Sequence, residues 1–443
     1  MPLERRLRRT LPAAFALTVL AGLPLARAEI TSADVERLAA ERSQRLIEWR
    51  RDIHQHPELG NREQRTSKLV AAHLRSLGLD VRTGIATTGV AAVLKGGRPG
   101  PVIALRADMD ALPVTERTDV PFKSTVKSEY RGQTVGVMHA CGHDSHTAIL
   151  MAAAQSLASV KAQLPGTILF IFQPAEEGVP DGEKGGAKEM LAQGLFDIVK
   201  PEAVFGLHVF SILHTGDIGY RSGPFMAGSD SFRIVVTGKQ THGAVPWQGT
   251  DPIVAAAQIV EALQTVVSRQ VNITENPAIV TVGAINGGIR NNIIPDQVEL
   301  LGTIRTFSKE QRALVFERVE RVAKNTAAAT GASATFTVGE APYPVTFNDP
   351  ALTQRVLPSL QKVIGAEHTK EIPLVTGAED FSFFGERVPA FYFFVGVTPP
   401  DRDLATAPAN HSPLFYIDEA ALQPALRALM QVTVDYLQGG KGS

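Results

Sequence analysis

Residues 134–160 read TVGVM-HACGHDSH-TAILMAAAQSLASV, and the eight in the middle hold three imidazoles, a carboxylate and the only cysteine of the chain. The five residues before them favour a strand and the fourteen after them an apolar helix, so the eight are predicted to form a short loop. Side chains two apart on extended backbone share a face, which would bring His139, Cys141 and His143 together. Zinc and similar metals prefer thiolate and imidazole ligands. The alternative is a buried or reactive cysteine among solvated histidines, and this stretch alone leaves both open.

Predicted helices and strands alternate around this loop. Residues 33–79 carry apolar side chains at helical spacing, and short apolar runs of strand type fall at 89–96, 101–108, 166–173 and 203–210. Such alternation is typical of the α/β class. It predicts a mixed, mostly parallel sheet with helices on both faces.

Polar side chains follow three of these strands where each strand ends. They are Asp108 and Asp110, Glu176 and Glu177, and His208. Sites in open α/β sheets gather at the carboxyl ends of the strands. Adjacent side chains on extended backbone point opposite ways, so one glutamate could bind a metal while the other acts as general base. Each residue alone also fits a structural role, such as a solvated turn, a packed histidine or a cap.

The pattern changes near residue 228. Residues 228–340 are predicted to follow the order β-α-β-β-α-β of the ferredoxin-like unit, with Asp251-Pro252 starting its first helix. From residue 341 the chain returns to short strands and a closing helix. The sequence therefore predicts a catalytic domain of residues 29–227 and 341–443, interrupted by an inserted α+β satellite domain.

The first 28 residues have the order of a secretory signal peptide. A basic start is followed by an apolar run from Leu11 to Leu25, and Ala26-Arg27-Ala28 fits a cleavage site. The apolar run is short and contains two prolines, which argues against a membrane span or anchor. We therefore expect an exported protein, periplasmic or secreted. Its single cysteine cannot form an internal disulfide. It is therefore either an oxidation-prone thiol without a function or a functional residue.

Composition narrows the possible partners. The 443 residues carry a formal net charge of -1, with 44% hydrophobic and 20% charged residues. This balance suits a globular protein and offers no strongly basic surface to a polyanion. Neither a nucleic acid nor an anionic membrane surface is expected as a partner.

Nine motifs along the chain resemble a single family. In order they are RRDIHQHPELG (50–60), ALRADMDALPV (104–114), HACGHDSHTAILMAAA (139–154), PAEEG (174–178), GLHV (206–209), NNIIPD (291–296), GTIR (302–305), GAEDFSFF (377–384) and NHSP (410–413). They resemble the dinuclear metallo-amidohydrolases and metallopeptidases related to carboxypeptidase G and aminoacylase, and most closely the hippurate hydrolase and auxin-conjugate (IAA-amino acid) hydrolase branch. The resemblance implies an α/β domain with two divalent metal ions, Zn, Mn or Co. It also implies a satellite domain that makes a homodimer or a higher homo-oligomer.

The resemblance also assigns residues, motif by motif. It implies that the metal ligands are Cys141, His143, Glu177, His208 and His411. Glu176 would be the catalytic base, and Asp108 would orient a ligand imidazole. His242, in THGAVP, would reach into the site of the partner subunit and polarise the scissile carbonyl. Asn292 and Arg305 would hold the carboxylate of the substrate, for which the fork of an arginine is suited.

The chain departs from the wider family at two positions. Relatives begin with a His-x-Asp ligand pair, where this chain has Arg106-Ala107-Asp108. The branch that it resembles makes the same exchange and uses the Cys-x-His cluster instead. Members of the branch often have a histidine after the proline of the THGAVP motif, where this chain has Trp247, and this exchange would reshape the substrate pocket.

The implied function is hydrolysis of the amide bond of small N-acyl or N-aroyl amino acids, by metal-activated water with Glu176 as general base. A metallo-carboxypeptidase or dipeptidase of the same family is the alternative. Two further classes are a hydrolase with Cys141 as nucleophile and His143 or His146 as its base, and an exported protein that only binds acyl amino acids. A cysteine nucleophile would leave the pair Glu176 and Glu177 without a role. A protein that only binds its ligand would not need a general base.

Overall fold

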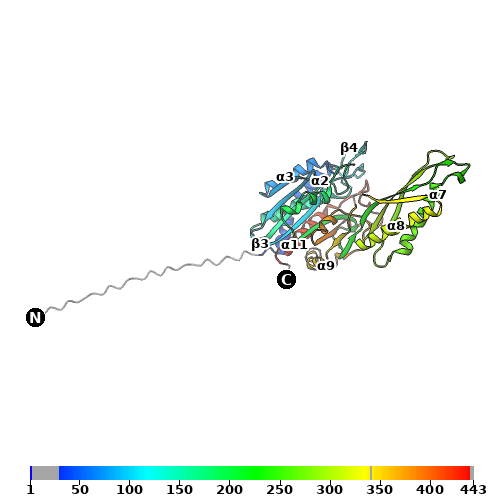
Figure 1. Ribbon diagram of the computed structural model, residues 1–443. Coiled ribbons are helices and arrows are strands. Elements are labelled where there is room, and N and C mark those ends of the chain that lie inside the picture. Colours follow the sequence, from blue (N-terminus) through cyan, green and yellow to red (C-terminus); the bar gives the residue numbers. More distant parts are fainter. Residues whose placement is uncertain (2–28, 340–341, 440–443) are drawn as a thin grey trace.

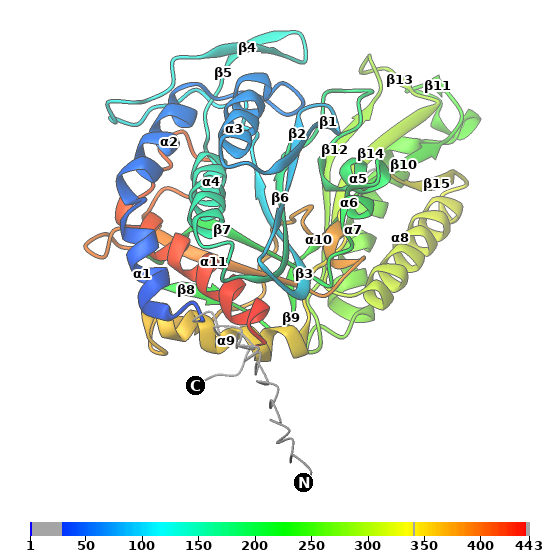
Figure 2. The same cartoon turned by 90° about the vertical axis from the view of Figure 1, so that its left-hand side faces the viewer.

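An eight-stranded sheet organises the larger of two bodies in the computed structural model, which describes residue 1 and residues 29–339 and 342–439 (Figures 1 and 2). The strand order is β1-β2-β6-β3-β7-β18-β8-β17. The strands are β1 Asp80–Ile85, β2 Gly89–Lys95, β3 Arg98–Asp108, β6 Pro165–Gln173, β7 Ala203–His214, β8 Ile218–Tyr220, β17 Thr369–Glu371 and β18 Ala390–Thr398. The central run β6-β3-β7-β18 is parallel, whereas β2 is antiparallel to its neighbours β1 and β6. The predicted mixed, mostly parallel sheet is confirmed.

Helices cover both faces of this sheet, because successive strand residues point to opposite sides. Ile103 and Leu105 of β3 pack into one hydrophobic core, and Ala104 between them packs into the other. The first core is closed by α1 Ser32–Ala40, α2 Ser43–Gln55, α3 Gln64–Ser76, α4 His143–Ser159, α9 Pro350–Ile364 and α11 Leu422–Leu437. The second is closed by α5 Gly186–Ala192, α6 Leu195–Ile198 and α10 Ser382–Gly385, on the opposite side of the sheet in Figure 2.

The smaller body is a four-stranded antiparallel sheet with two helices on one face. Its strand order is β12-β14-β10-β15. The elements are β10 Gly228–Thr237, α7 Pro252–Gln270, β12 Ile279–Gly287, β14 Gln297–Thr306, α8 Lys309–Ala329 and β15 Ser333–Val338. This is the predicted β-α-β-β-α-β unit. Asp251 and Ser308 start its two helices, since each side-chain oxygen accepts a hydrogen bond from a first-turn N–H.

The remaining elements lie at the ends of the two bodies. They are the hairpin β4 Lys127–Tyr130 and β5 Gln133–Gly136, the pair β9 Gly223–Met226 and β16 Thr346–Asn348, the pair β11 Thr241–His242 and β13 Ile293–Ile294, and the short helices η1 Pro246–Gln248 and η2 Glu419–Ala421. The chain leaves the larger body after β9 and returns at β16, so this strand pair marks the junction. The pair β11–β13 lies at the far end of the smaller body (Figure 2).

The signal peptide expected over residues 1–28 lies, apart from Met1, outside the described residues. None of the helices in the described ranges combines the length and the apolar character that crossing a bilayer requires.

The central loop turns into helix earlier than the sequence pattern suggests. Helix α4 begins at His143, directly after Gly142, whose φ is 99°. Glycine adopts this left-handed conformation without a steric penalty. A Cβ at this position would lie 2.3 Å from Cγ2 of Val209. Because the backbone is not extended here, the alternation that would group His139 with Cys141 and His143 does not apply.

Replacing Gly142 by alanine should lower the free energy of unfolding by roughly 2–5 kcal/mol. About 1–2 kcal/mol comes from the left-handed backbone, and about 1–3 kcal/mol from forcing Val209 aside. Gly216 is a matched control, since its φ is 98° and an added Cβ would meet nothing within 4 Å. Urea denaturation should show only the backbone contribution for Gly216→Ala. Equal losses in the two variants would contradict the steric argument.

Candidate metal centre

Five side chains from four segments meet at one edge of the large sheet. They are Cys141 before α4, His143 in its first turn, Glu177 after β6, His208 on β7 level with the end of β3, and His411 in the loop before η2. Their ligand atoms form two groups, Cys141–His143–His208 and Cys141–Glu177–His411, and the atoms of each group lie within 4.8 Å of one another. The sulfur of Cys141 is common to both groups. The structure therefore offers two adjacent candidate cation positions that share a thiol.

The two buried histidines of these groups turn their Nε2 atoms toward the centre. His143 donates from Nδ1 to Oδ1 of Asp110 at 3.2 Å, and its Nε2 has no hydrogen-bond partner among the described residues. His208 donates from Nδ1 to the carbonyl oxygen of Val209 at 2.7 Å, and its Nε2 lies 3.3 Å from Sγ of Cys141. A hydrogen bond on one nitrogen fixes the tautomer and leaves the lone pair of the other for a metal.

Glu177 and His411 complete the second group. Oε1 of Glu177 lies 3.0 Å from Nε2 of His411, yet it makes no hydrogen bond within the described part of the chain. Two ligands of one tetrahedral ion, each bound at about 2.0–2.1 Å, lie roughly 3.3 Å apart. The contact fits two ligands of a shared cation. The backbone N–H of His411 is held by the carbonyl oxygen of Ala140 at 2.7 Å, and Nδ2 of Asn410 donates to the carbonyl oxygen of Cys141 at 3.1 Å.

The electrostatics of the centre favour a cation. Burial alone would lower the pKa of His143, but the carboxylates of Asp108, Asp110 and Glu177 outweigh it and raise this pKa to about 10. Burial raises the pKa of the Cys141 thiol, and the charges of Glu177 and Glu176 raise it further. Nucleophilic cysteines instead lie in electropositive surroundings. The protein alone therefore keeps Cys141 protonated, whereas a bound cation would stabilise its thiolate.

His146 and His139 are not among the five candidate ligands, although His146 lies with Asp108 and His143 in a further group of possible ligand atoms. His146 donates from Nδ1 to Asp108 at 2.6 Å and accepts at Nε2 from the backbone N–H of Val209 at 2.9 Å, so neither nitrogen is free. Asp108 therefore orients His146, while Asp110 holds the candidate ligand His143. His139 belongs to neither group. Its two ring nitrogens are buried without a hydrogen-bond partner among the described residues, and burial lowers its pKa to about 3.

Glu176 lies beside the centre on a tight turn. Its Oε2 is 3.9 Å from Nε2 of His143, and Oε1 of Glu177 is 4.0 Å from the same atom. The two carboxylates thus face one centre instead of diverging, because the backbone of Ala175 before them has a φ of 52°. Glu63 accepts the N–H of Ala175 at 2.8 Å and supports this turn. Burial, and then the charges of Glu379 and Glu177, raise the pKa of Glu176.

Arg106 pairs with a second row of three carboxylates behind Glu176 and offsets part of their charge. Its guanidinium is buried and lies 2.6 Å from Asp108, 2.9 Å from Glu379 and 3.0 Å from Asp380. The carboxylates of Glu176, Glu379 and Asp380 are close enough to form a further group that could hold a cation. The arginine thus supplies a fixed positive charge at the strand position where the wider family has a ligand imidazole.

The satellite residues assigned by resemblance lie in two places. His242 is exposed on β11, and its neighbour Gly243 donates to the carbonyl oxygen of Asn292, so both lie at the far end of the smaller body. Arg305 lies near the opposite end of β14, paired with Ser229 beside the junction. The ten residues of β14 span about 30 Å. Within a single chain, Asn292 and Arg305 are therefore far apart, and His242 does not reach the metal centre.

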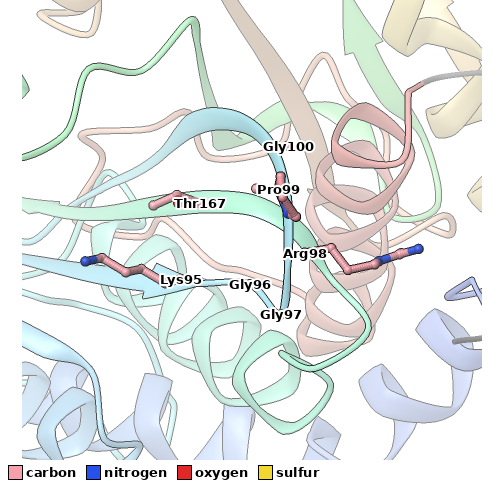
Figure 3. A pocket seen from close by; sticks show the side chains of 8 residues that line it. Lys95, Gly96, Gly97, Arg98, Pro99, Gly100 and Thr167 are labelled. Atoms are coloured by element: carbon pink, nitrogen blue, oxygen red, sulfur yellow. The ribbon is translucent and has the colours of Figure 1, made fainter. Parts of the chain in front are cut away.

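A cavity of about 450 Å³ lies at the other end of the sheet, around the turn between β2 and β3. Figure 3 shows the side chains of Lys95 and Arg98 pointing in opposite directions along a glycine-rich wall. No set of polar side chains converges there, so it does not compete with the carboxyl edge as a catalytic site.

Several residues that build the centre were not singled out from the sequence. Glu63 and Asn410 hold backbone groups, and Tyr343 donates from its hydroxyl to the carbonyl oxygen of Glu176 at 2.7 Å. Glu379 and Asp380 were visible only as part of the GAEDFSFF motif. A contact between segments more than 100 residues apart produces no periodic pattern in the sequence, so it could not be predicted. A pair of acidic residues inside a motif does indicate a possible site.

Comparisons with known proteins agree with this geometry. A sequence model of peptidase family M20/M25/M40 matches residues 104–435. The chain is 41% identical over 379 residues to thermostable carboxypeptidase 2 of Saccharolobus solfataricus, covering 85% of this chain and 92% of that protein. It is 36% identical over 438 residues to the IAA-amino acid hydrolase ILR1-like 2 of Arabidopsis thaliana, covering 97% and 95% of the two chains. Among solved structures, the Bacillus subtilis YXEP protein, described as a dinuclear metal-binding peptidase, superposes with a TM-score of 0.74 at 37% identity, covering 90% of this chain and 99% of that one.

Replacing Asp110 by asparagine should weaken metal binding about 10–100-fold, the usual effect of removing a carboxylate that orients a ligand histidine. Asp110 accepts from both His143 and the backbone N–H of Glu177, the latter at 2.9 Å. Calorimetric titration of the metal-free protein with Zn²⁺ measures the effect. Asp52→Asn, in an ion pair on the surface, is the control and should bind like the wild type. Unchanged affinity in Asp110→Asn would contradict the role given to Asp110.

Proposed function

This chain belongs to peptidase family M20/M25/M40, and we propose that it is a hydrolase of N-acyl or N-aroyl amino acids that carry a free carboxylate. The observation that carries the proposal is the set of converging ligand atoms beside the carboxylate of Glu176, in which Nε2 of His143 and Oε1 of Glu177 are buried without hydrogen-bond partners among the described residues. Such a set has no use in a fold that needs only stability, because each unpaired buried polar group costs about 1–3 kcal/mol.

The residues divide into ligands and a base. Two divalent ions, Zn, Mn or Co, would be held by Cys141, His143, Glu177, His208 and His411. Bound ions of this kind supply Lewis acidity, which polarises an acyl carbonyl and acidifies water. Glu176 takes the proton of the attacking water and returns it to the nitrogen of the departing amino acid. Burial and the charges of Glu379 and Glu177 raise the pKa of Glu176, which favours the step in which it returns the proton as an acid.

The carboxylate of the substrate is assigned to Arg305. Its guanidinium makes no ion pair within the described residues, since the nearby Asp230 is bound by Arg312 at 2.7 Å. Burial of such an unpaired guanidinium lowers its pKa, and an anion would relieve that penalty. The two relatives above are named as a carboxypeptidase and an IAA-amino acid hydrolase. Both names imply a free carboxylate beside the cleaved amide, so carboxypeptidase or dipeptidase activity is the second candidate.

A second copy of the chain would supply the remaining groups. His242 and Asn292 lie together and exposed, about 30 Å along β14 from the junction. We therefore assign them to the centre of a partner subunit in a homodimer, where His242 would stabilise the negative charge on the acyl oxygen. Trp247, 76% exposed five residues further on, would reach the same centre and contact the acyl group.

Replacing Glu176 by glutamine should lower kcat by at least about 10²–10⁴, because the water loses its base while size and hydrogen bonding are nearly kept. Metal content and substrate binding should remain. The assay is amino acid release from acetyl-, benzoyl- and indoleacetyl-amino acids by the metal-loaded enzyme. Glu183→Gln, in a surface ion pair with Arg62, is the control and should retain activity. Turnover by Glu176→Gln at the wild-type rate would refute the assigned role.

Mixing two inactive variants tests the role of the partner subunit. His242→Ala should lower kcat by about 10²–10³, as removal of one oxyanion donor does. In a heterodimer of His242→Ala with Glu176→Gln, one of the two centres has both residues intact. After random exchange of subunits, about a quarter of the wild-type activity should return. Failure of the mixture to regain activity, with subunit exchange verified by mass spectrometry, would contradict a shared centre.

A further inference from the structure

His411 lies in the longest irregular segment of the metal centre. Residues 399–418, between β18 and η2, contain no helix or strand. The backbone of His411 has a φ of 72°, a left-handed conformation that residues other than glycine rarely adopt. Its side chain is 55% exposed, so packing alone does not hold it in place. A ligand in this position depends on neighbouring groups that fix the segment.

The side chain of the preceding residue, Asn410, is fully hydrogen-bonded within the protein. Its Nδ2 donates to the carbonyl oxygens of Cys141 and Val209, both at 3.1 Å. Its Oδ1 accepts from the backbone N–H of Ser211 at 3.2 Å and from the hydroxyl of Ser211 at 3.3 Å. An asparagine side chain offers two N–H donors and two acceptor lone pairs. These four bonds therefore use its whole capacity.

The four bonds join three segments that each carry a candidate ligand. The first segment is the loop that contains Cys141, the second is the part of β7 that contains His208, and the third contains His411. The carbonyl oxygen of Val209 also accepts from Nδ1 of His208 at 2.7 Å, so one oxygen connects Asn410 to a ligand imidazole. One amide thus relates two ligands of the first group to His411 of the second group.

The other hydrogen bonds near His411 do not make this connection. The N–H of His411 donates to the carbonyl oxygen of Ala140 at 2.7 Å, and the N–H of Arg117 donates to the carbonyl oxygen of Pro413 at 2.8 Å. Both bonds lead to loops. Among residues 409–413, all of which the structure describes, only Asn410 forms hydrogen bonds with β7. The distance from His411 to the ligand on β7 is therefore set by Asn410.

We propose that Asn410 is a positioning residue of the metal centre, which holds His411 ready for the second cation before that cation binds. The amide orders the segment during folding, so the second cation does not have to order it. Without the amide, a cation at the second group would first have to fix His411, and its affinity would fall. The inference rests on the proposed function in so far as that function needs the metal centre, but it depends on no particular substrate.

Calorimetric titration of the metal-free protein with Zn²⁺ tests the proposal. The wild type should bind two ions, and His411→Ala identifies which of the two events belongs to the second group. Asn410→Ala should weaken that event about 10–100-fold and the other less than about threefold. Asn410→Ser keeps a polar group that is too short to reach all three segments. It should give the same result, and it replaces Asn410→Ala in the titration if the alanine variant does not fold.

Asn348→Ala is a matched control for the loss of a buried asparagine. Asn348 donates from Nδ2 to the carbonyl oxygens of Arg221 and Tyr392 at 2.9 and 2.8 Å, and it accepts from the N–H of Tyr392 at 2.7 Å. Neither partner is a candidate ligand or a sequence neighbour of one. Its replacement should lower Tm but leave both zinc affinities unchanged. An equal loss of zinc affinity in the Asn348 and Asn410 variants would overturn the proposal.

A double variant separates positioning from general destabilisation. If Asn410 acts through His411, the variant His411→Ala/Asn410→Ala should bind zinc like His411→Ala alone, because the group that Asn410 positions is already absent. Additive losses in the double variant, or unchanged zinc binding by Asn410→Ala, would overturn the proposal. A wild type that binds fewer than two zinc ions would refute the metal centre, and with it both this proposal and the proposed function. If the wild type binds two ions but hydrolyses no acyl amino acid, only the proposed function fails, and the titrations still decide the role of Asn410.

Discussion

The folded chain brings five possible metal ligands together among carboxylates, and this concentration of ligand atoms and negative charge shapes the rest of the larger body. Nε2 of His143 and Oε1 of Glu177 have no hydrogen-bond partners among the described residues, and the Cys141 thiol lies among carboxylates. Each such atom opposes folding by about 1–3 kcal/mol when it stays unpaired. Two cations, one at each candidate position, would convert these atoms into ligands, so the site is complete only as a metal complex. Metal binding should therefore also stabilise the fold.

The surrounding structure serves to hold these atoms in place. Asp110 fixes both His143 and the backbone of Glu177, and Glu63 fixes the turn that presents the two glutamates. Arg106 pairs with the carboxylates of Asp108, Glu379 and Asp380 but offsets only one of their charges, so a net negative charge remains beside the candidate ligands. The proposed base, the candidate ligands and the residues that support them thus come from segments that are far apart in the sequence and meet at one edge of the sheet. Substitutions in the loops at this edge of the sheet should reduce activity more than they reduce the stability of the fold.

Sequence patterns predicted the two sheets and the inserted unit well, because apolar periodicity and the capping residue Asp251 are local signals. They also pointed to the strand ends as the site. The sequence patterns gave wrong side-chain directions where an unusual backbone conformation determines them. Gly142 with its left-handed φ removes His139 from the cluster, and Ala175 turns Glu176 and Glu177 toward the same point. They also did not reveal that Asn292 and Arg305 lie at opposite ends of β14, or that Tyr343 links the junction to the base. These relations depend on long-range packing, which no short stretch of sequence encodes.

Anomalous X-ray diffraction at the zinc absorption edge, on crystals of the zinc-loaded protein, tests the central claim most directly. The account predicts two adjacent anomalous peaks per chain, with Cys141 between them, His143 and His208 on one ion, and Glu177 and His411 on the other. Zinc bound at His146 or His139 with these five side chains unligated, or no peak at the carboxyl edge of the sheet, would contradict it.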